Sequence, residues 1–280
     1  MIKIHYLLAI LAANFLINYS YKPEAKFQKS KYTLDNSNTL MGNPSNAGTS
    51  SIENFLLDRK YFSLSYSATR NIPNWVSWHI DLNDIGSTDR QNNFHSDTEL
   101  PHSWYKVNES SYTGSGFDRG HNCPSADRTK STTANSTTFL MTNMIPQAPN
   151  HNRKTWAKLE DYIRELVKSG NEAYIIMGNY GIGGTGSKGY ASSISSNRIT
   201  VPARIWKVIL LLPEGTNDLN RINGKTRVIA VDTPNINSID NNWKLYRTSV
   251  DAIEKATGYD LFSNIPESIQ KTIEVKIDKE

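Results

Sequence analysis

The spacing of apolar residues predicts β-strands through the middle of the chain. Apolar and polar residues alternate at 61–66 and again at 76–82, a pattern typical of two neighbouring, half-buried strands. His79 falls in the second strand, and we expect it to face solvent or a polar neighbour rather than to carry function. Apolar runs predict three further strands, at 173–177, 206–212 and 227–231.

Two helices follow from a different spacing. Apolar residues recur at steps of three and four along 155–168, which predicts an amphipathic helix that Gly170 ends. A shorter helix is predicted at 250–257, where Gly258 supplies the C-terminal stop. A last small helix is expected within 261–277. Strands and helices are mixed without a regular βαβ alternation, so we expect an α+β fold.

The N-terminus is the one membrane-like part of the sequence. Lys3 precedes an apolar stretch at 6–16, and polar residues follow it. This pattern favours a secretory signal peptide at 1–24 over an uncleaved membrane anchor. A polar linker at 25–40 and a single folded domain at 41–280 are expected to follow. We therefore expect a secreted or periplasmic protein with no stable membrane association after the leader is removed.

The composition narrows the class of protein. Hydrophobic residues make up 38% of the 280 residues, which is enough for a packed core and excludes wholesale disorder. The formal net charge of +4 is mildly basic and does not by itself indicate a nucleic-acid partner. Cys123 is the one cysteine, so an intramolecular disulfide and a zinc site of several thiolates are both excluded.

A glycine pattern in the second half of the chain imitates a nucleotide-binding motif. Gly181, Gly183 and Gly186 have the spacing of a dinucleotide-binding loop, but no amphipathic helix follows them. The next acidic residue is Glu214, which is not at the distance of about 20 residues that such a site requires. We interpret this stretch as a flexible surface loop.

The residue types that carry chemistry lie between Phe117 and Glu160. His121 has a side chain that can take a proton from water near neutral pH. Arg119 offers a planar fork that matches two phosphate oxygens, and an amide oxygen such as that of Asn152 suits a hard divalent cation. Glu160 can orient a water of that cation. A base, a phosphate clamp and a hydrated metal are the parts needed to hydrolyse a phosphodiester.

Each of these residues also has a purely structural interpretation. Arg119 could form a surface ion pair with Asp118, and Glu160 could pair with Arg164 at i,i+4, a contact worth about 0.3–0.5 kcal/mol. Cys123 stands near His121, but two ligands do not make a zinc site. The residue types and spacing alone leave these alternatives open.

Three motifs in a fixed order favour the catalytic interpretation of these residues over the structural one. Asp-Arg-Gly-His at 118–121 is followed by Asn-x-x-Pro-Gln at 143–147 and by Asn-x-x-x-Trp-x-x-x-Glu at 152–160. Together they resemble the DNA/RNA non-specific endonuclease family, secreted nucleases of the ββα-metal class, and the string at 117–129 is similar to the cyanobacterial branch. The resemblance implies the ββα-metal fold, with a mixed or antiparallel central sheet flanked by helices.

The resemblance also implies roles for individual residues. His121 matches the family's general base. Asn152 matches its sole direct protein ligand for Mg²⁺ or Mn²⁺, and it stands at the start of the predicted helix, a favourable N-cap position. Glu160 matches a residue that holds a metal-bound water. Arg119 matches a phosphate-contacting arginine, and Arg90 matches a second arginine that stabilises the leaving side.

Three further residues take supporting places in the same comparison. Asn143 matches a polar active-site residue that supports the others. Asp118 is expected to orient the residues that contact the substrate and the metal. Cys123 stands where relatives often carry a small residue, which favours packing over chemistry. Basic residues near the motifs either track phosphates or form a solvated face: Arg128, Lys130, Arg153, Lys154 and Lys158.

The activity that the resemblance implies is metal-dependent cleavage of DNA and RNA without base specificity, with 5′-phosphate products. Such a nuclease endangers its own host, and the resemblance implies that either export before folding or a cognate inhibitor protein as a further partner would meet this hazard. Two other functions stay open at this point: a catalytically inactive relative that binds extracellular nucleic acid, and a phosphodiesterase or phosphatase that acts on small substrates.

Overall fold

The computed structural model describes residues 35–280, so the predicted leader and most of the predicted linker lie outside the described residues. The described residues belong to one compact unit. Its packing begins before residue 41, because Leu40 is buried and the Asn38 side chain donates a hydrogen bond to the backbone oxygen of Arg59 at 3.3 Å. Within residues 35–280, no helix is both long and apolar enough to cross a membrane.

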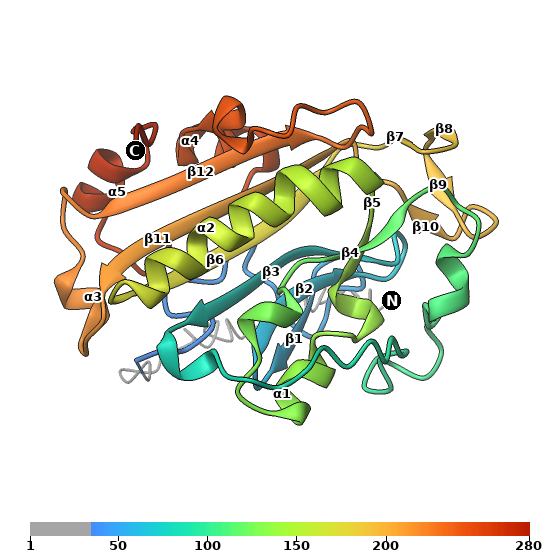
Figure 1. Ribbon diagram of the computed structural model, residues 1–280, viewed down its shortest axis with the longest axis horizontal. Helices are drawn as coiled ribbons and strands as arrows, with labels where there is room; N and C mark the ends of the chain where they lie inside the picture. Colours follow the sequence, from blue (N-terminus) through green and yellow to red (C-terminus); the bar gives the residue numbers. More distant parts are fainter. Residues whose placement is uncertain (1–34) are drawn as a thin grey trace, which may run out of the picture. The chain divides into compact units, whose positions relative to one another are not determined.

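A seven-stranded sheet forms the centre of the domain (Figure 1). Its strand order is β1-β2-β3-β6-β11-β12-β13, and every neighbouring pair is antiparallel. The sheet is therefore antiparallel rather than mixed. Its strands are β1 (Phe55–Arg59), β2 (Phe62–Ser67), β3 (Ile72–Ile80), β6 (Asn171–Tyr180), β11 (Arg204–Pro213), β12 (Arg227–Pro234) and β13 (Arg247–Thr248).

Short two-stranded pairs lie outside this sheet. They are β4 (Asp118–His121) with β5 (Met144–Gln147), β7 (Gly184–Gly186) with β8 (Gly189–Ala191), and β9 (Ser193–Ile194) with β10 (Ile199–Thr200). The glycine pattern that we interpreted as a loop thus contributes to a β-hairpin. Gly181 and Gly183 lead into it with φ angles of 69° and 97°, a region that favours glycine.

The helices flank the sheet (Figure 1). The α-helices of residues 35–280 are α1 (Thr132–Thr137), α2 (Ala157–Lys168), α3 (Asp218–Arg221), α4 (Val250–Thr257) and α5 (Glu267–Ile273). A π-helical turn at His151–Trp156 leads directly into α2. Short 3₁₀ turns occupy Leu82–Asp84, Glu109–Tyr112, Ser125–Asp127, Met141–Asn143 and Trp243–Tyr246.

The two faces of the sheet bury separate apolar clusters. On β11, Ile205 and Ile209 belong to the cluster that packs against α2, whereas Trp206 and Val208 belong to the cluster that packs against α4 and α5. Because successive side chains of a strand point to opposite faces, a strand covered on both sides appears as a continuous apolar run. The α2 helix and the α4–α5 pair therefore cover opposite faces of the sheet.

The periodicity predictions locate the long elements. The helix predicted at 250–257 matches α4, and the helix predicted at 155–168 covers α2 together with the end of the π-helical turn. The five predicted strands correspond to β2, β3, β6, β11 and β12. His79 is not solvent-facing: it is buried, and its Nε2 lies 3.0 Å from Glu172 Oε2, which is the polar-neighbour alternative.

Candidate active site

The β4–β5 hairpin displays three of the predicted site residues. Arg119 and His121 stand two positions apart on β4, so they share one face of the strand. Both contact Phe94 there: the Arg119 guanidinium carbon lies 4.1 Å from the centroid of the Phe94 ring, and the His121 and Phe94 ring centroids are 5.6 Å apart. Asp118 points the other way, toward the π-helical turn.

Gly120 sets the spacing of this hairpin. A Cβ atom at Gly120 would lie 2.4 Å from Gln147 Oε1 and 2.6 Å from Gln147 Cβ. Gln147 is fully buried on the paired strand, so a larger residue at 120 would push β4 away from β5. The close approach that this glycine allows is therefore within the chain itself, and it fixes the positions of Asp118 and His121.

Asn152 lies in the first turn of the π-helical segment, which differs from the predicted N-cap position. Its backbone N–H already donates to Ala148 O, four residues earlier in the chain, at 2.9 Å. Its side-chain Nδ2 donates to Asp118 Oδ2 at 2.9 Å, and the Arg153 guanidinium donates to both carboxylate oxygens of Asp118 at 2.8 and 2.6 Å. Asp118 thus fixes which end of the amide faces outward. Single π-helical turns are frequent at functional sites.

A cleft of about 370 Å³ opens beside these residues. Four of the predicted site residues line it: Arg90, Asp118, Arg119 and Asn152. The other three lie outside its lining: His121, Asn143 and Glu160. Phe94 connects the two sets, because it lines the cleft and its ring also packs against the ring of His121.

The His121 ring is held between aromatic side chains. Its centroid lies 5.0 Å from that of Phe139 and 5.6 Å from that of Phe94. The side chain is partly exposed, but Nε2 is buried and has no hydrogen-bond partner among the described residues. Burial, followed by the positive charges of Arg90 and Arg119, lowers the pKa of His121 to about 3. The imidazole is therefore neutral at pH 7 and able to accept a proton.

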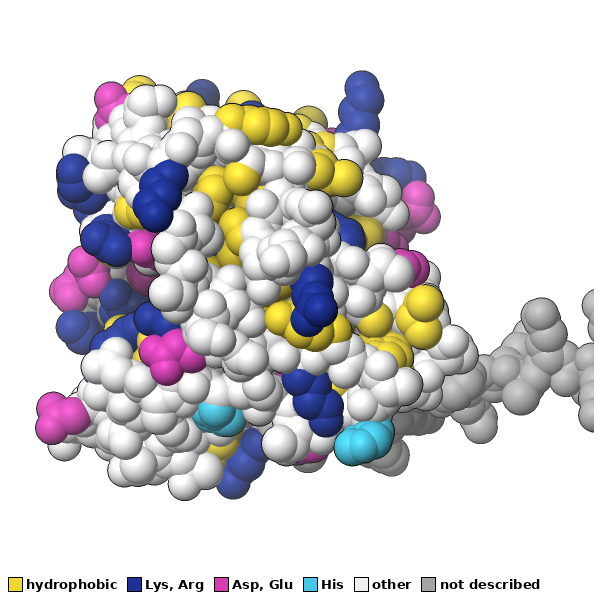
Figure 2. Space-filling model, turned by 90° about the vertical axis from the view of Figure 1, so that its right-hand side faces the viewer, with side chains coloured by type: hydrophobic (Ala, Val, Ile, Leu, Met, Phe, Trp, Pro, Cys, Tyr) yellow, Lys and Arg dark blue, Asp and Glu magenta, His cyan; other side chains and the backbone are white. Residues whose placement is uncertain are grey.

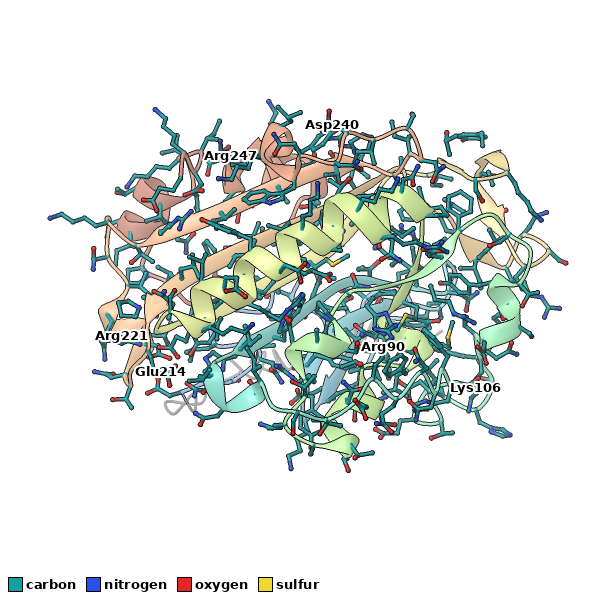
Figure 3. All side chains as sticks on the ribbon, viewed as in Figure 1. Arg90, Lys106, Glu214, Arg221, Asp240 and Arg247 are labelled. Atoms are coloured by element: carbon teal, nitrogen blue, oxygen red, sulfur yellow. The ribbon has the colours of Figure 1, made fainter. Side chains whose placement is uncertain are left out.

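Arg90 and Arg119 reach the cleft from separate segments. Arg90, labelled in Figure 3, donates from Nε to Asn92 Oδ1 at 2.8 Å and from Nη1 to Ser125 Oγ at 2.5 Å. Arg119 pairs with Glu109 Oε1 at 2.9 Å rather than with the adjacent Asp118. A guanidinium has five N–H donors, so each arginine keeps donors free for phosphate oxygens.

Glu160 belongs to a group of buried charges behind the cleft that the sequence patterns did not reveal. Its Oε1 lies 3.4 Å from Nζ of Lys207, which is fully buried in β11 and stacks on the ring of Trp156 at 4.9 Å. Arg164 pairs with Asp127 at 2.8 Å instead of with Glu160. Burial raises the pKa of Glu160, and the nearby Lys207 and Arg164 oppose that rise. The signal for Lys207 in the sequence is a lone lysine inside an apolar strand.

Replacing Lys207 with methionine is expected to destabilise the protein by about 3 kcal/mol, because removing one partner of a buried ion pair leaves the other charge uncompensated. Chemical denaturation measures this change in the free energy of unfolding. Lys158→Met, which alters an exposed lysine of α2, is the matched control and should change stability little. Adding Glu160→Gln to Lys207→Met should restore part of the loss; an undiminished loss in the double variant would contradict the pairing.

Asn143 supports the fold around the site and has no free group to offer a substrate. It is fully buried, its Oδ1 accepts from the backbone N–H of Cys123 at 3.0 Å, and its Nδ2 donates to the backbone oxygens of Cys123 and Thr138 at 2.9 and 2.8 Å. These bonds fasten the chain that leaves β4 directly after His121. Cys123 is buried and free, and burial raises the pKa of its thiol, in keeping with a packing role.

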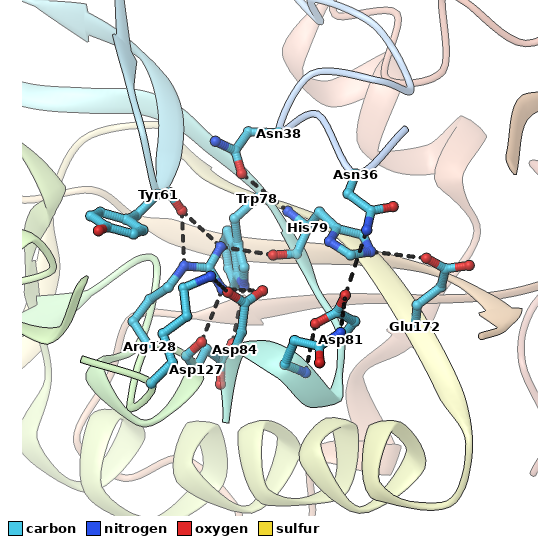
Figure 4. A network of polar contacts seen from close by, with 12 residues as sticks. Asn36, Asn38, Tyr61, Trp78, His79, Asp81, Asp84, Asp127, Arg128 and Glu172 are labelled. Atoms are coloured by element: carbon cyan, nitrogen blue, oxygen red, sulfur yellow. Dashed lines mark hydrogen bonds and ion pairs between the residues drawn. The ribbon is translucent and has the colours of Figure 1, made fainter. Parts of the chain in front are cut away.

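Arg128 is buried, so it neither tracks phosphates nor belongs to a solvated face, and both interpretations given above are wrong for this residue. Its guanidinium donates to the backbone oxygens of Tyr61 and His79, each at 2.7 Å, and pairs with Asp84 at 3.3 Å (Figure 4). It lies next to Asp127, whose backbone oxygen accepts another of its N–H groups at 2.9 Å. Arg128 thus joins the ends of two strands to the loop that precedes α1.

The other basic residues near the motifs remain at the surface. Lys130 pairs with Asp84 at 2.7 Å, and Arg153 pairs with Asp118, whereas Lys154 and Lys158 are exposed. On the face that Figure 2 shows, Lys and Arg side chains gather at the left edge, with Asp and Glu side chains among them. Positive charge is therefore interrupted rather than continuous on this face.

Comparisons of the sequence with known proteins find a family of nucleases. The family model for DNA/RNA non-specific endonucleases matches residues 41–268. A nuclease from Nostoc sp. is 45% identical over 241 residues, which cover 85% of each chain. Nuclease C1 from Cunninghamella echinulata var. echinulata is 30% identical over 219 residues, which cover 75% of this chain and 83% of that relative.

A solved structure shows the fold. A chain of the EndoG/EndoGI complex, whose crystal structure concerns the mechanism of EndoG inhibition, matches with a TM-score of 0.69 and 23% identity. The match covers 89% of this chain and 99% of that chain. The α+β architecture is thus that of the ββα-metal nucleases. On the strength of the family model and of these relatives, the chain belongs to the DNA/RNA non-specific endonuclease family.

Proposed function

We propose that the protein is a secreted or periplasmic endonuclease that hydrolyses phosphodiester bonds of DNA and RNA without base specificity, depends on Mg²⁺ or Mn²⁺, and leaves 5′-phosphates. The coarser activity, a hydrolase that cleaves nucleic acid, is indicated by the family and by the related nucleases. One observation carries the finer proposal: Asp118 orients the Asn152 amide in an arginine-lined cleft, and His121 stands on the same strand as Asp118.

His121 is the proposed general base. A neutral imidazole carries one N–H and one free lone pair. Nε2 is buried. Nδ1 is not buried, and it forms no hydrogen bond within residues 35–280. Nδ1 is therefore the nitrogen that a water can reach. The attacking water would give its proton to Nδ1 while its oxygen bonds to phosphorus and the bond from phosphorus to the 3′ oxygen breaks.

The arginines supply the charge that this step requires. Phosphodiester hydrolysis gathers negative charge on the phosphate oxygens, and preorganised donors aimed at those oxygens stabilise it. Arg119 and Arg90 both line the cleft, and each is held by a neighbouring side chain: Glu109 for Arg119, Ser125 for Arg90. These contacts fix the guanidinium groups before substrate arrives, so little reorganisation accompanies the reaction.

The donor set fits a hard divalent cation. Within residues 35–280, Asn152 Oδ1 accepts no hydrogen bond, because Asp118 binds the nitrogen end of that amide. An amide oxygen with water is a ligand set that Mg²⁺ and Mn²⁺ accept. Asn152 would hold the cation directly, and Glu160 would hold a water of its shell. When bound, the cation would supply Lewis-acid stabilisation of charge on the phosphate and the leaving oxygen.

The cleft also explains an absence of base preference. Apart from the Asp118 carboxylate, its polar lining consists of guanidinium, amide and hydroxyl groups, which bind phosphates in protein–DNA complexes. Water as the nucleophile needs no 2′-hydroxyl, so the same mechanism serves both DNA and RNA. Binding through phosphates should weaken as the salt concentration rises.

A protein inhibitor is the partner that we propose besides nucleic acid. A nuclease with little base preference threatens any nucleic acid that it meets before export. Support comes from a protein of the same fold, since the matched crystal structure is that of the EndoG/EndoGI complex and concerns the mechanism of EndoG inhibition.

The function is tested by incubating plasmid DNA and a long RNA with the purified protein in Mg²⁺, in Mn²⁺ and in EDTA. We expect both substrates to be cut in either metal and left intact in EDTA, with 5′-phosphates on the new ends. Binding without cleavage in every metal would favour the inactive relative. Faster hydrolysis of a small chromogenic diester than of long nucleic acid would favour the small-substrate phosphodiesterase.

A further inference from the structure

Four carboxylates gather where α4 meets the end of α5, on the face of the sheet opposite the cleft. Asp251 and Glu254 lie on α4, Asp260 follows that helix, and Glu274 directly follows α5 (Figure 1). One carboxylate oxygen from each of Asp251, Glu254 and Glu274 lies within 4.8 Å of the other two. In the described part of the chain, none of the four forms an ion pair with a lysine, arginine or histidine. The cluster therefore gathers carboxylates that no basic side chain of the described residues neutralises.

Glu274 is the unusual member of this cluster. Only 5% of the residue is exposed, and its Oε1 is buried without any hydrogen-bond partner among the described residues. The preceding Ile273 is fully buried in the core, and the Glu274 backbone oxygen accepts from the Asp251 N–H at 3.2 Å. The backbone thus holds this carboxylate against α4. Burying an unpaired carboxylate is costly, so the group requires either a proton or a bound cation.

A proton on Glu274 is the alternative to a bound cation. Burial, followed by the charges of Glu254, Asp251 and Asp260, raises the pKa of Glu274 to about 8. The same burial and the charges of Asp260 and Asp251 raise the pKa of Glu254. A shared proton would relieve one negative charge, but it would leave the remaining carboxylates next to one another.

We propose that Asp251, Glu254 and Glu274 form a binding site for a calcium ion. Carboxylate oxygens are the ligands that Ca²⁺ prefers, at about 2.3–2.6 Å. Two ligands of one such ion are at most about 4.6–5.2 Å apart, and the three oxygens meet this limit because they lie within 4.8 Å of one another. Asp251 is exposed, so water can complete the six to eight oxygens that Ca²⁺ takes.

The ion would join α4 to the C-terminal end of α5 and so fasten the last helix to the domain. Glu254 keeps an oxygen for this purpose, because only its Oε1 is engaged, by the Leu261 N–H at 2.8 Å. Mg²⁺ fits less well, since it demands octahedral geometry at about 2.0–2.1 Å and dehydrates reluctantly. This site is separate from the proposed catalytic metal, and the proposal does not depend on the nuclease activity.

Calorimetric titration of calcium into chelator-treated protein at pH 7.5 tests the proposal. The Asn152→Ala background removes the proposed catalytic ligand, so any binding at the cleft is excluded from the signal. We expect one calcium ion per chain and at least tenfold weaker binding in Glu274→Gln. Glu267→Gln, which alters an exposed carboxylate of α5 paired with Lys271, is the matched control and should bind as the background does.

Thermal unfolding gives a second readout. Calcium at a hundredfold excess over its Kd should raise the Tm of the background and of Glu267→Gln by about 5 °C, and should leave Glu274→Gln unchanged. Without calcium, Glu274→Gln should melt no lower than the background, because it removes repulsion. Magnesium should produce the smaller shift. No calcium heat and no Tm shift, or equal responses in Glu274→Gln, would overturn the site and leave a proton as the neutralising partner.

Discussion

Replacing His121 with alanine is expected to lower kcat for plasmid cleavage by about 10²- to 10⁴-fold, the range that loss of a positioned general base commonly produces. The reason is that, among the residues that the structure describes, no other histidine lines the cleft to take its place or approaches it with a free ring in the way His121 does through Phe94. His151 is fully buried and bonds to Thr233 Oγ1 at 3.0 Å on the sheet side. Initial rates at saturating substrate and metal measure the effect.

The His121 ring also packs between Phe94 and Phe139, so alanine leaves a cavity there. His121→Asn is therefore the second variant, because it keeps a planar polar group and should retain more of the packing. His102→Ala, at an exposed histidine outside the cleft, is the control and should cleave at the parent rate. Full activity in both His121 variants would remove this residue from the mechanism.

The pH profile separates this base from an ordinary histidine. Since the folded protein lowers the pKa of His121 to about 3, the neutral, active form persists as the pH falls from 7 to 5. The dependence of kcat/KM on pH reports groups of the free enzyme, so it should show no loss near pH 6.5 from this ring. A half-maximal kcat/KM at pH 6.5 that disappears in His121→Asn would contradict the low pKa.

The helices and strands predicted correctly from the sequence are those whose apolar pattern lies within one short segment. The amphipathic spacing of α2 and α4 and the apolar runs of β6, β11 and β12 follow directly from burial on one or both faces. The glycine-rich segment at 181–186 was predicted to be a flexible loop, but part of it forms a β-hairpin. A distant segment holds this hairpin in place, since the Ser187 N–H donates to Gly116 O at 2.9 Å. A contact across 71 residues leaves no periodicity to recognise.

The site residues divide in the same way. The motifs identified Asp118 and Asn152, but the hydrogen bond between them, 34 residues apart, replaced the expected N-cap. Arginine is usually a surface residue, yet Arg128 is buried. Burial is possible here because the backbone carbonyl groups of Tyr61 and His79 accept hydrogen bonds from its guanidinium. Which long-range acceptor a polar side chain finds depends on the tertiary fold, and a single sequence does not encode it in any spacing.

Replacing Asn152 with alanine is expected to lower the cleavage rate by at least about 10²-fold at 1 mM Mg²⁺, because it deletes the one protein oxygen proposed to bind the cation. Asp118→Asn should cost less, about 10- to 100-fold, since partners that orient a metal ligand typically contribute that much. Rates measured across a range of Mg²⁺ concentrations distinguish the two variants. Excess metal should restore part of the activity of Asp118→Asn and little of that of Asn152→Ala.

The double variant decides whether the two residues act through their shared hydrogen bond. If Asp118 matters because it presents the Asn152 oxygen, then Asp118→Asn has nothing left to disturb once Asn152 is alanine. The double variant should therefore cleave about as fast as Asn152→Ala alone, a strongly non-additive result. Asn241→Ala, at an exposed asparagine outside the cleft, controls for the chemical change and should have no effect. Additive losses would mean that Asp118 acts on the substrate independently, for example through Arg153, which bonds to the same carboxylate.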